Sequence, residues 1–238
     1  MFFDIETAPN LAWVWAMWEQ DVIALKKEWY ILSFAAKWLN GKTIVRALPD
    51  YPIYKKDKEN DKDLIRELWE LINKADIVIA HNGNEFDIKK ANVRFIKHGL
   101  LPPSDFKTID TLKVARKYFN FNSNSLNDLG IFLGVGGKIK VDKSVWLGCL
   151  NGDPLAWKKM RRYNRRDMTL LYEVYMILRP WIADHPNFSL TGGCPKCGSS
   201  KLHQRGYGIT RTGKYPRYQC QQCASWSRGK HKQLTTIR

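Results

Sequence analysis

The sequence predicts an α/β protein, with a mixed sheet flanked by helices and a small additional module at the C-terminal end. Short apolar runs come first and then alternate with segments of helical spacing, which is the order of elements in folds that cover a sheet with helices. Close to the C-terminus, two Cys-x2-Cys pairs lie in a stretch with few large apolar residues. That combination is typical of a small module that folds around a metal ion.

Size and cysteine usage argue against several classes of protein. A chain of 238 residues buries enough surface to fold without disulfides. Five cysteines are an odd number, and four of them form the two pairs, which favours metal binding and a reducing intracellular compartment such as the cytoplasm. No apolar run approaches the ~18 residues of a membrane span, and the N-terminus lacks the pattern of a signal peptide. We therefore expect neither a secreted nor a membrane, fibrous or disordered protein.

The elements of the α/β part follow from local patterns taken in order. Strands are expected at short apolar runs, and Asn40-Gly41 predicts a hairpin turn between two of them. The expected strands are residues 2–6, 29–39, 43–48, 76–80 and 106–109. Helices are expected where apolar residues recur every three or four positions, and Pro154 suits the first turn of the longest one. The expected helices are residues 64–72, 84–98, 111–118, 125–133 and 154–179.

The uneven distribution of charge divides the chain. The formal net charge is +16, and residues 188–238 hold ten Lys or Arg and no Asp or Glu. The other 187 residues hold 29 basic and 23 acidic residues, a net charge of +6. Such an excess favours a polyanionic partner, usually nucleic acid, because neutralised phosphates release counterions. We predict a globular domain over residues 1–183, a linker over 184–193, and a metal module with a basic tail over 194–238.

Four carboxylates and a phenol stand out because three distant elements carry them. Asp4 and Glu6 are two apart on an expected strand, so their side chains leave the same face. Asp87 follows a buried strand, and Tyr163 and Asp167 share one face of the long helix. If these elements converge, the acids form an all-oxygen site suited to Mg²⁺ or Mn²⁺. Two such ions catalyse phosphodiester displacement, and the phenol is placed to orient or deprotonate the attacking water.

Three motifs together resemble a known enzyme family. They are residues 3–7 (FDIET), 81–87 (HNGNEFD) and 163–167 (YNRRD). In this order they resemble the DEDD superfamily of 3′–5′ exonucleases, which has the ribonuclease-H-like fold. The third motif is similar to the tyrosine branch, which includes the proofreading domains of B-type polymerases, whereas the other branch has His where this sequence has Arg162. The resemblance covers roughly residues 1–183.

The resemblance implies a function and a set of site residues. It implies that Asp4, Glu6, Asp87 and Asp167 hold two Mg²⁺ or Mn²⁺ ions and that Tyr163 orients the water. The implied activity is 3′–5′ exonucleolytic release of nucleoside monophosphates, with single-stranded DNA favoured and RNA possible as substrate. Two alternatives stay open: an endonuclease or RNA-trimming nuclease on the same fold, and a non-catalytic nucleic-acid-binding adaptor. No membrane partner is expected, and no protein partner is indicated.

Several further residues have a plain structural interpretation beside a functional one. Asp110 competes as a further carboxylate, but a structural role is favoured. The candidate substrate contacts are Asn82, Asn124, Arg162, Arg166, Tyr215 and Arg217. The alternative for these residues is a structural role in a loop, a helix cap or an exposed helix face. Four tryptophans follow the first motif, at positions 13, 15, 18 and 29. Core packing is expected for most of them, and stacking on single-stranded bases is the alternative.

The cysteine pairs predict a zinc site. Cys194 and Cys197 are separated from Cys220 and Cys223 by 22 residues, which fits four thiolates around one structural Zn²⁺ with a hairpin between the pairs. This part resembles the zinc ribbons of insertion-sequence transposases, which implies DNA binding rather than catalysis. A purely structural or protein-binding ribbon is the alternative. The fifth cysteine, Cys149, has no assigned partner and is expected to be a buried thiol.

Overall fold

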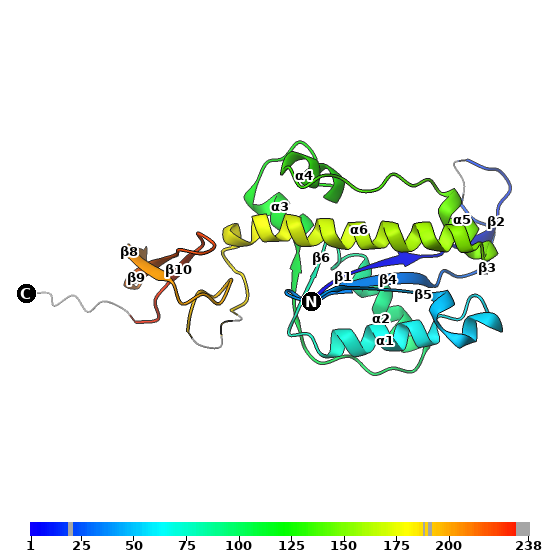
Figure 1. Ribbon diagram of the computed structural model, residues 1–238, viewed down its shortest axis with the longest axis horizontal. Coiled ribbons are helices and arrows are strands. Elements are labelled where there is room, and N and C mark those ends of the chain that lie inside the picture. The colour runs from blue at the N-terminus through cyan, green and yellow to red at the C-terminus, as the bar shows by residue number, and fades with distance from the viewer. Residues whose placement is uncertain (19–20, 188, 190–191, 232–238) are drawn as a thin grey trace, which may run out of the picture. The chain divides into compact units, whose positions relative to one another are not determined.

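A computed structural model describes residues 1–18, 21–187, 189 and 192–231 (Figure 1). The chain forms two compact units. The first comprises Met1–Lys113 and Phe121–Val174, and the second comprises Val114–Asn120 and Tyr175–Arg238. The domain boundaries expected from the sequence stay a prediction, and residues 188, 190 and 191 of the expected linker lie outside the described residues.

A five-stranded mixed sheet organises the first unit. Its strands lie in the order β5 (Thr43–Ala47), β4 (Ile31–Lys37), β1 (Phe2–Thr7), β6 (Ile77–Ala80) and β7 (Lys107–Asp110). The pairs β1–β4 and β4–β5 are antiparallel, whereas β1–β6 and β6–β7 are parallel. All five expected strands are confirmed, and β1 is central although it begins at the second residue.

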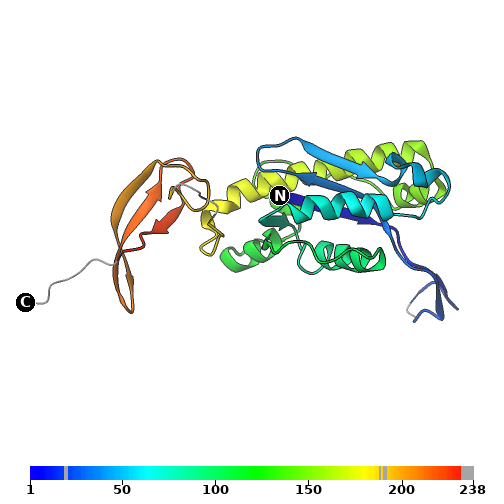
Figure 2. The same cartoon turned by 90° about the horizontal axis from the view of Figure 1, so that it is seen from below.

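Helices cover both faces of the sheet. In Figures 1 and 2, α6 runs across one face, and α1 and α2 cover the other. The helices are α1 (Lys62–Asn73), α2 (Asp87–Lys97), α3 (Thr111–Tyr118), α4 (Leu126–Phe132), α5 (Ser144–Asn151) and α6 (Pro154–Leu178). The expected helices are present, but α2 begins three residues late because residues 82–86 form a turn. The short helix α5 was not predicted, since only Val145 and Cys149 of its eight residues are buried and no amphipathic pattern develops.

The alternation of side chains along β1 decides what faces each helical layer. Phe2 packs edge-on against Tyr172 of α6, with ring centroids 5.3 Å apart. Phe3 and Ile5 point the other way and join the core that contains buried residues of α1 and α2. The two acidic residues of β1 share the Phe2 face, so the strand directs its carboxylates toward α6.

A small hairpin, β2 (Leu11–Trp13) with β3 (Ala24–Lys27), overturns the expectation for most of the tryptophans. Trp13, Trp15 and Trp18 are 59%, 88% and 79% exposed, so core packing was the wrong prediction for them. Among the described residues these two strands pair only with each other, and no residue of either strand is buried. Hydrophobic side chains on a two-stranded ribbon have no second layer to pack against, which the composition alone does not reveal.

The second unit contains a three-stranded antiparallel sheet. Its order is β10 (Trp226–Arg228), β9 (Gly213–Cys220) and β8 (Leu202–Thr210). The hairpin expected between the cysteine pairs is therefore confirmed. Most residues of these strands are exposed or half-buried, so the sheet has little hydrophobic core of its own. Within the described residues, no helix has both the length and the hydropathy needed to cross a bilayer.

Candidate functional site

Three of the predicted carboxylates meet where β1 faces α6. Asp4 and Glu6 leave β1 on one face, and Asp167 leaves α6 toward them. One oxygen from each of these carboxylates lies within 4.8 Å of the others. Residues separated by about 160 positions thus form one acidic cluster, as the motifs predicted.

The fourth carboxylate, Asp87, lies beside this trio. It is the first residue of α2, and its Oδ1 accepts a hydrogen bond from the backbone N–H of Ile5 at 3.1 Å. Asp87 therefore sits next to β1 between the two acids of that strand. The tight turn before it needs Gly83, because a Cβ there would lie 2.3 Å from the Cβ of Ala80. The structure brings all four acids to one place, although Asp87 is outside the group of three with mutually close oxygens.

Burial and mutual repulsion perturb the acids strongly. Burial, followed by the charges of Asp87, Glu6 and Asp167, raises the pKa of Asp4 well above its usual range. Burial, followed by Asp167, raises the pKa of Glu6 to about 8. Burial raises the pKa of Asp87 to about 6, against the effect of its hydrogen bond from Ile5. The cluster is therefore costly to ionise without a compensating cation.

A cation that the sequence analysis missed lies in this cluster. The Nζ of Lys138 donates to Asp167 Oδ2 at 2.6 Å and lies 3.4 Å from the hydroxyl oxygen of Tyr163. Burial lowers the pKa of Lys138, but Asp167, Tyr163 and Asp4 outweigh it and raise the pKa overall. Nothing in the local sequence indicates that a lysine after a glycine-rich turn lies beside the acids. The turn is held by elements that come together only in the folded protein.

The turn that carries Lys138 is held by the long helix and by α4. Residues 134–138 include two glycines with positive φ, at 134 and 136. The guanidinium of Arg166 donates to two carbonyls of this turn, at 2.8 and 3.0 Å. The backbone N–H of Lys138 donates to Asn127 Oδ1 at 3.0 Å. Arg166 was a candidate substrate contact from the sequence. In the structure it donates hydrogen bonds to the turn that positions Lys138.

Two further polar side chains orient the acids. Asn164 is fully buried, and its Nδ2 donates to Asp4 Oδ2 at 2.8 Å. The side chain of Trp146 on α5 lowers the pKa of Glu6 as a hydrogen-bond donor, and its ring packs edge-on against Tyr163 at a centroid distance of 5.7 Å. Neither residue was expected at the site from the sequence. The signal for Asn164 was available, because a polar residue on the buried face of a helix requires a partner.

The phenol of Tyr163 is protonated at neutral pH. Burial, followed by the charge of Asp167, raises the pKa of Tyr163 above its usual range. A hydrogen bond with Tyr163 in turn lowers the pKa of Asp167, which burial raises. A phenol whose pKa is raised suits the orientation of a water better than the removal of its proton.

The other residues singled out in the α/β part have varied surroundings. Asp110 accepts backbone N–H groups of Asn82 at 2.9 Å and Leu112 at 3.0 Å, which is a structural role. Asn82 has a φ of 64° and forms part of the same turn. The Oδ1 of Asn124 is buried and has no hydrogen-bond partner among the described residues. Arg162 is exposed on α6.

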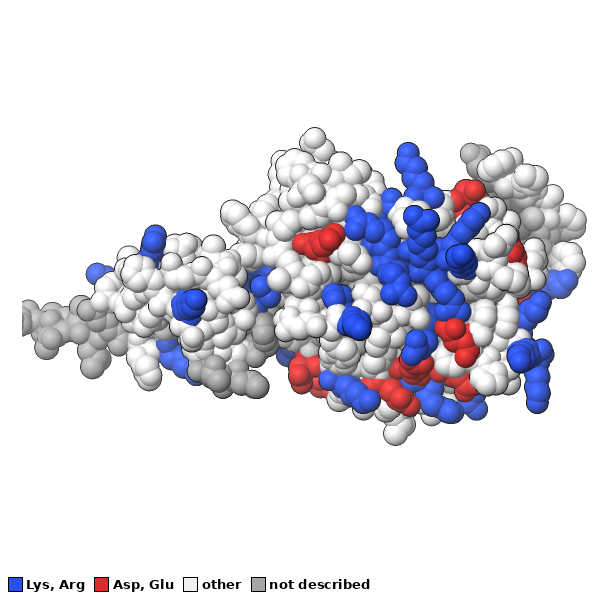
Figure 3. Space-filling view, in the orientation of Figure 1, with Lys and Arg blue, Asp and Glu red and all other residues white. Residues whose placement is uncertain are grey.

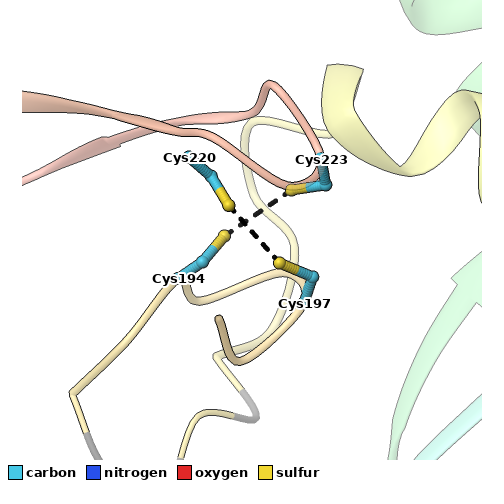
Figure 4. A group of neighbouring side chains, drawn as sticks. All are labelled: Cys194, Cys197, Cys220 and Cys223. Atoms are coloured by element: carbon cyan, nitrogen blue, oxygen red, sulfur yellow. Dashed lines mark hydrogen bonds between the residues drawn. The ribbon is translucent and has the colours of Figure 1, made fainter. Parts of the chain in front are cut away.

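The four paired cysteines form a second candidate site (Figure 4). The Sγ atoms of Cys194 and Cys223 are 3.8 Å apart, and those of Cys197 and Cys220 are 3.5 Å apart. These separations are far too long for disulfides and close to the ~3.8 Å edge of a tetrahedron with Zn–S bonds of about 2.3 Å. The cluster fits a small zinc ribbon. Cys149 is separate from it and buried, as expected.

Basic and aromatic side chains pair on the strands of the ribbon. The guanidinium of Arg228 lies over the ring of Tyr215, and that of Arg217 lies over Trp226, each 4.6 Å from the ring centroid. Arg217 is exposed and Tyr215 is half-buried. The two candidate contacts of this module therefore lie on β9, each in its own cation–π pair.

The side chains of the acidic cluster are suited to bind divalent metal ions. All of its donor atoms are carboxylate oxygens, which hard cations such as Mg²⁺ and Mn²⁺ prefer. The Oδ1 of Asp167 is buried and has no hydrogen-bond partner among the described residues, so it has a lone pair to offer. Burial and mutual repulsion raise the pKa values of Asp4 and Glu6, and a bound cation would oppose both effects.

Comparisons with known proteins agree with this architecture. The family model of the RNase_H superfamily matches residues 1–179. The structure of the family B DNA polymerase from the hyperthermophilic archaeon Pyrobaculum calidifontis is similar, with a TM-score of 0.53 and 14% sequence identity. The similarity covers 75% of this chain but 25% of the polymerase chain, and at this identity it shows the fold alone. No curated protein sequence matches the chain significantly.

Proposed function

The chain belongs to the RNase_H superfamily, and from this premise we propose that it is a metal-dependent 3′–5′ exonuclease that releases nucleoside monophosphates from single-stranded DNA. The observation that supports this proposal most is the cluster of Asp4, Glu6 and Asp167 with Asp87 beside it. Asp87 and Asp167 are buried, and Asp4 and Glu6 are half-buried. Like charges gathered in such a place are expensive without cations to bind them. The phenol of Tyr163 beside the cluster favours hydrolysis over simple metal storage.

The four carboxylates would hold the metal ions. When bound, Mg²⁺ or Mn²⁺ makes a water nucleophilic and stabilises the negative charge of the departing 3′ oxygen. Asn164 holds the carboxylate of Asp4 in one orientation through its 2.8 Å hydrogen bond, and Trp146 lies beside Glu6. Fixed ligands lower the reorganisation needed when the substrate binds.

Two residues beside the cluster would act on the substrate. The hydroxyl of Tyr163 orients the attacking water for in-line displacement at the terminal phosphodiester. The ammonium group of Lys138, 2.6 Å from Asp167, neutralises part of the acidic charge and favours the approach of an anionic phosphate. In the second unit, a single Zn²⁺ held by the four cysteines would stabilise the ribbon, and Tyr215 and Arg217 would contact nucleic acid.

Release of mononucleotides from a 5′-labelled single strand tests the proposal. With Mg²⁺ we expect a ladder that shortens one nucleotide at a time, and no ladder when the 3′ end is blocked. Asp167→Ala should abolish release but leave binding of the strand, whereas Asp105→Asn, at an exposed acid outside the site, should behave as the wild type. Cleavage of the blocked strand would favour an endonuclease, and binding without any cleavage would favour an adaptor.

A further inference from the structure

The basic residues of α6 near the acidic cluster do not share one role. Six Lys or Arg lie between positions 158 and 166. The guanidinium of Arg161 donates to both carboxylate oxygens of Asp50, at 2.6 and 2.9 Å. Arg166 holds the turn before Lys138. These two arginines are engaged within the fold, so the other basic residues need a separate explanation.

The other four residues present unpaired charge to solvent. Lys158, Lys159, Arg162 and Arg165 are exposed, and none forms an ion pair with a residue that the structure describes. Lys158, Arg162 and Arg165 are spaced by four and then three positions, which places these three on one face of the helix. From the first to the last they span ~10 Å along the helix axis. The charge is therefore arranged as a row.

The loop between α4 and α5 extends this row. Lys140 and Lys143 are exposed on it and have no ion-pair partner in the described part of the chain. Hydrogen bonds from Ser144 lower the pKa of Asp142 on this loop, and the nearby charge of Lys159 lowers it further, so the loop lies beside α6. Figure 3 shows Lys and Arg gathered over the first half of α6 and over this loop, with acidic residues toward the margins.

The loop connects the row to the acidic cluster. Lys158, Arg162 and Arg165 lie on the outer face of α6, opposite the face that carries Tyr163 and Asp167, whereas Lys138 of the loop contacts Asp167. A polyanion that follows the row onto the loop is thereby led to Lys138 and the acids. The alternative is that this basic face is merely solvated and improves solubility. In that case, removal of its charges should have no specific effect on the binding of nucleic acid.

We propose that Lys140, Lys143, Lys158, Arg162 and Arg165 form a track for the sugar-phosphate backbone of the substrate strand, leading its end to the acidic cluster. The proposal rests on the proposed nuclease function and adds where the substrate lies. Flexible lysine and arginine side chains on a convex helix face contact phosphates rather than base edges, so the track binds strands regardless of sequence. Counterion release makes its contribution strongly dependent on salt.

The salt dependence of binding tests the track. The triple variant Lys158→Gln, Arg162→Gln and Arg165→Gln keeps helix propensity while it removes three charges. Binding of a fluorescent oligothymidylate is measured by anisotropy in magnesium-free buffer, where no cleavage occurs, at salt concentrations of about 50 to 200 mM. Each lost phosphate contact reduces the slope of log K against log salt by about 0.7 for a single strand, so we expect a decrease of about 2.

A matched triple variant on α1 controls for net charge. Lys62 and Arg66 lie on α1 and Lys74 directly follows it, in the helical layer on the opposite face of the sheet. Lys62→Gln, Arg66→Gln and Lys74→Gln removes three exposed charges that have no ion-pair partner among the described residues. Its slope should stay within experimental error of the wild type. An equal decrease in both triples, or an unchanged slope in the α6 triple, overturns the proposal.

A second variant keeps the test decisive if the α6 triple folds poorly. Lys140→Gln with Lys143→Gln alters only the loop and should decrease the slope by about 1.4; an unchanged slope there also overturns the track. The outcome is independent of catalysis. If the variants show the expected decreases in slope but the wild type releases no mononucleotide, the nuclease function is wrong and the track stands. If the wild type releases mononucleotides but the variants keep the wild-type slope, the track is wrong and the nuclease function stands.

Discussion

Replacing Lys138 with glutamine removes the ammonium group that lies 2.6 Å from Asp167 Oδ2. The carboxylates of the site then face one another without that compensation, and their charges repel at short range. In magnesium-free buffer we expect Lys138→Gln to lower the free energy of unfolding. Bound Mg²⁺ should restore much of the loss, because the ion supplies positive charge in place of the lysine and binds only the native state.

The expected size follows from the burial of the two partners. The side chain of Asp167 is 2% exposed and that of Lys138 is 32% exposed. Removing one partner of a fully buried ion pair costs about 3–5 kcal/mol. Partial exposure of the lysine reduces this cost, and the raised pKa values of Asp4 and Glu6 allow the cluster to take up protons instead. We expect a loss of about 2 kcal/mol, or about 4–8 °C in Tm for a unit of this size.

Urea denaturation with and without saturating Mg²⁺ measures both effects. Lys27→Gln is the matched control, because Lys27 also lies 2.6 Å from its partner, Glu59, but the two side chains are 50% and 44% exposed. An exposed pair contributes about 1 kcal/mol or less. If Lys138→Gln costs no more than Lys27→Gln, or if Mg²⁺ leaves the difference between variant and wild type unchanged, the cluster is not short of positive charge and our electrostatic reasoning fails.

Three other predictions concern pH, geometry and zinc. Burial and Asp167 raise the pKa of Glu6 from 4.5 to about 8, so the native state holds this proton more tightly than the unfolded chain. Tm of the magnesium-free protein should therefore fall as the pH rises from about 4.5 to about 8. A Tm that does not change over this pH range would contradict the raised pKa. Asn164→Ala removes the 2.8 Å hydrogen bond to Asp4 and should destabilise by about 1–3 kcal/mol, with kcat falling more than KM rises in oligonucleotide cleavage; an unchanged kcat would exclude a positioning role. Cys220→Ser should abolish stoichiometric zinc in metal analysis and unfold the ribbon, while mononucleotide release continues; full zinc retention would show that the cysteines are not its ligands.

Much of the site could be predicted because its motifs rest on local periodicity. The two-residue spacing of Asp4 and Glu6 places both on one face of a strand whatever else the chain does. The four-residue spacing of Tyr163 and Asp167 does the same on a helix. The cysteine spacing works in the same way, since each Cys-x2-Cys turn brings two sulfurs to one ion. These geometries depend only on the backbone between nearby residues, so the sequence by itself determines them.

Other features depend on packing between elements that are distant in sequence. Lys138 reaches the acids because Arg166 and Asn127 hold its turn, and these contacts exist only once α4 and α6 are in place. The same applies to Trp146, whose helix has no amphipathic signature. The exposed Trp15 shows the converse, because a hydrophobic residue is buried only where a second layer covers it. Local spacing specifies the faces of the elements, and the tertiary structure alone decides what each face meets.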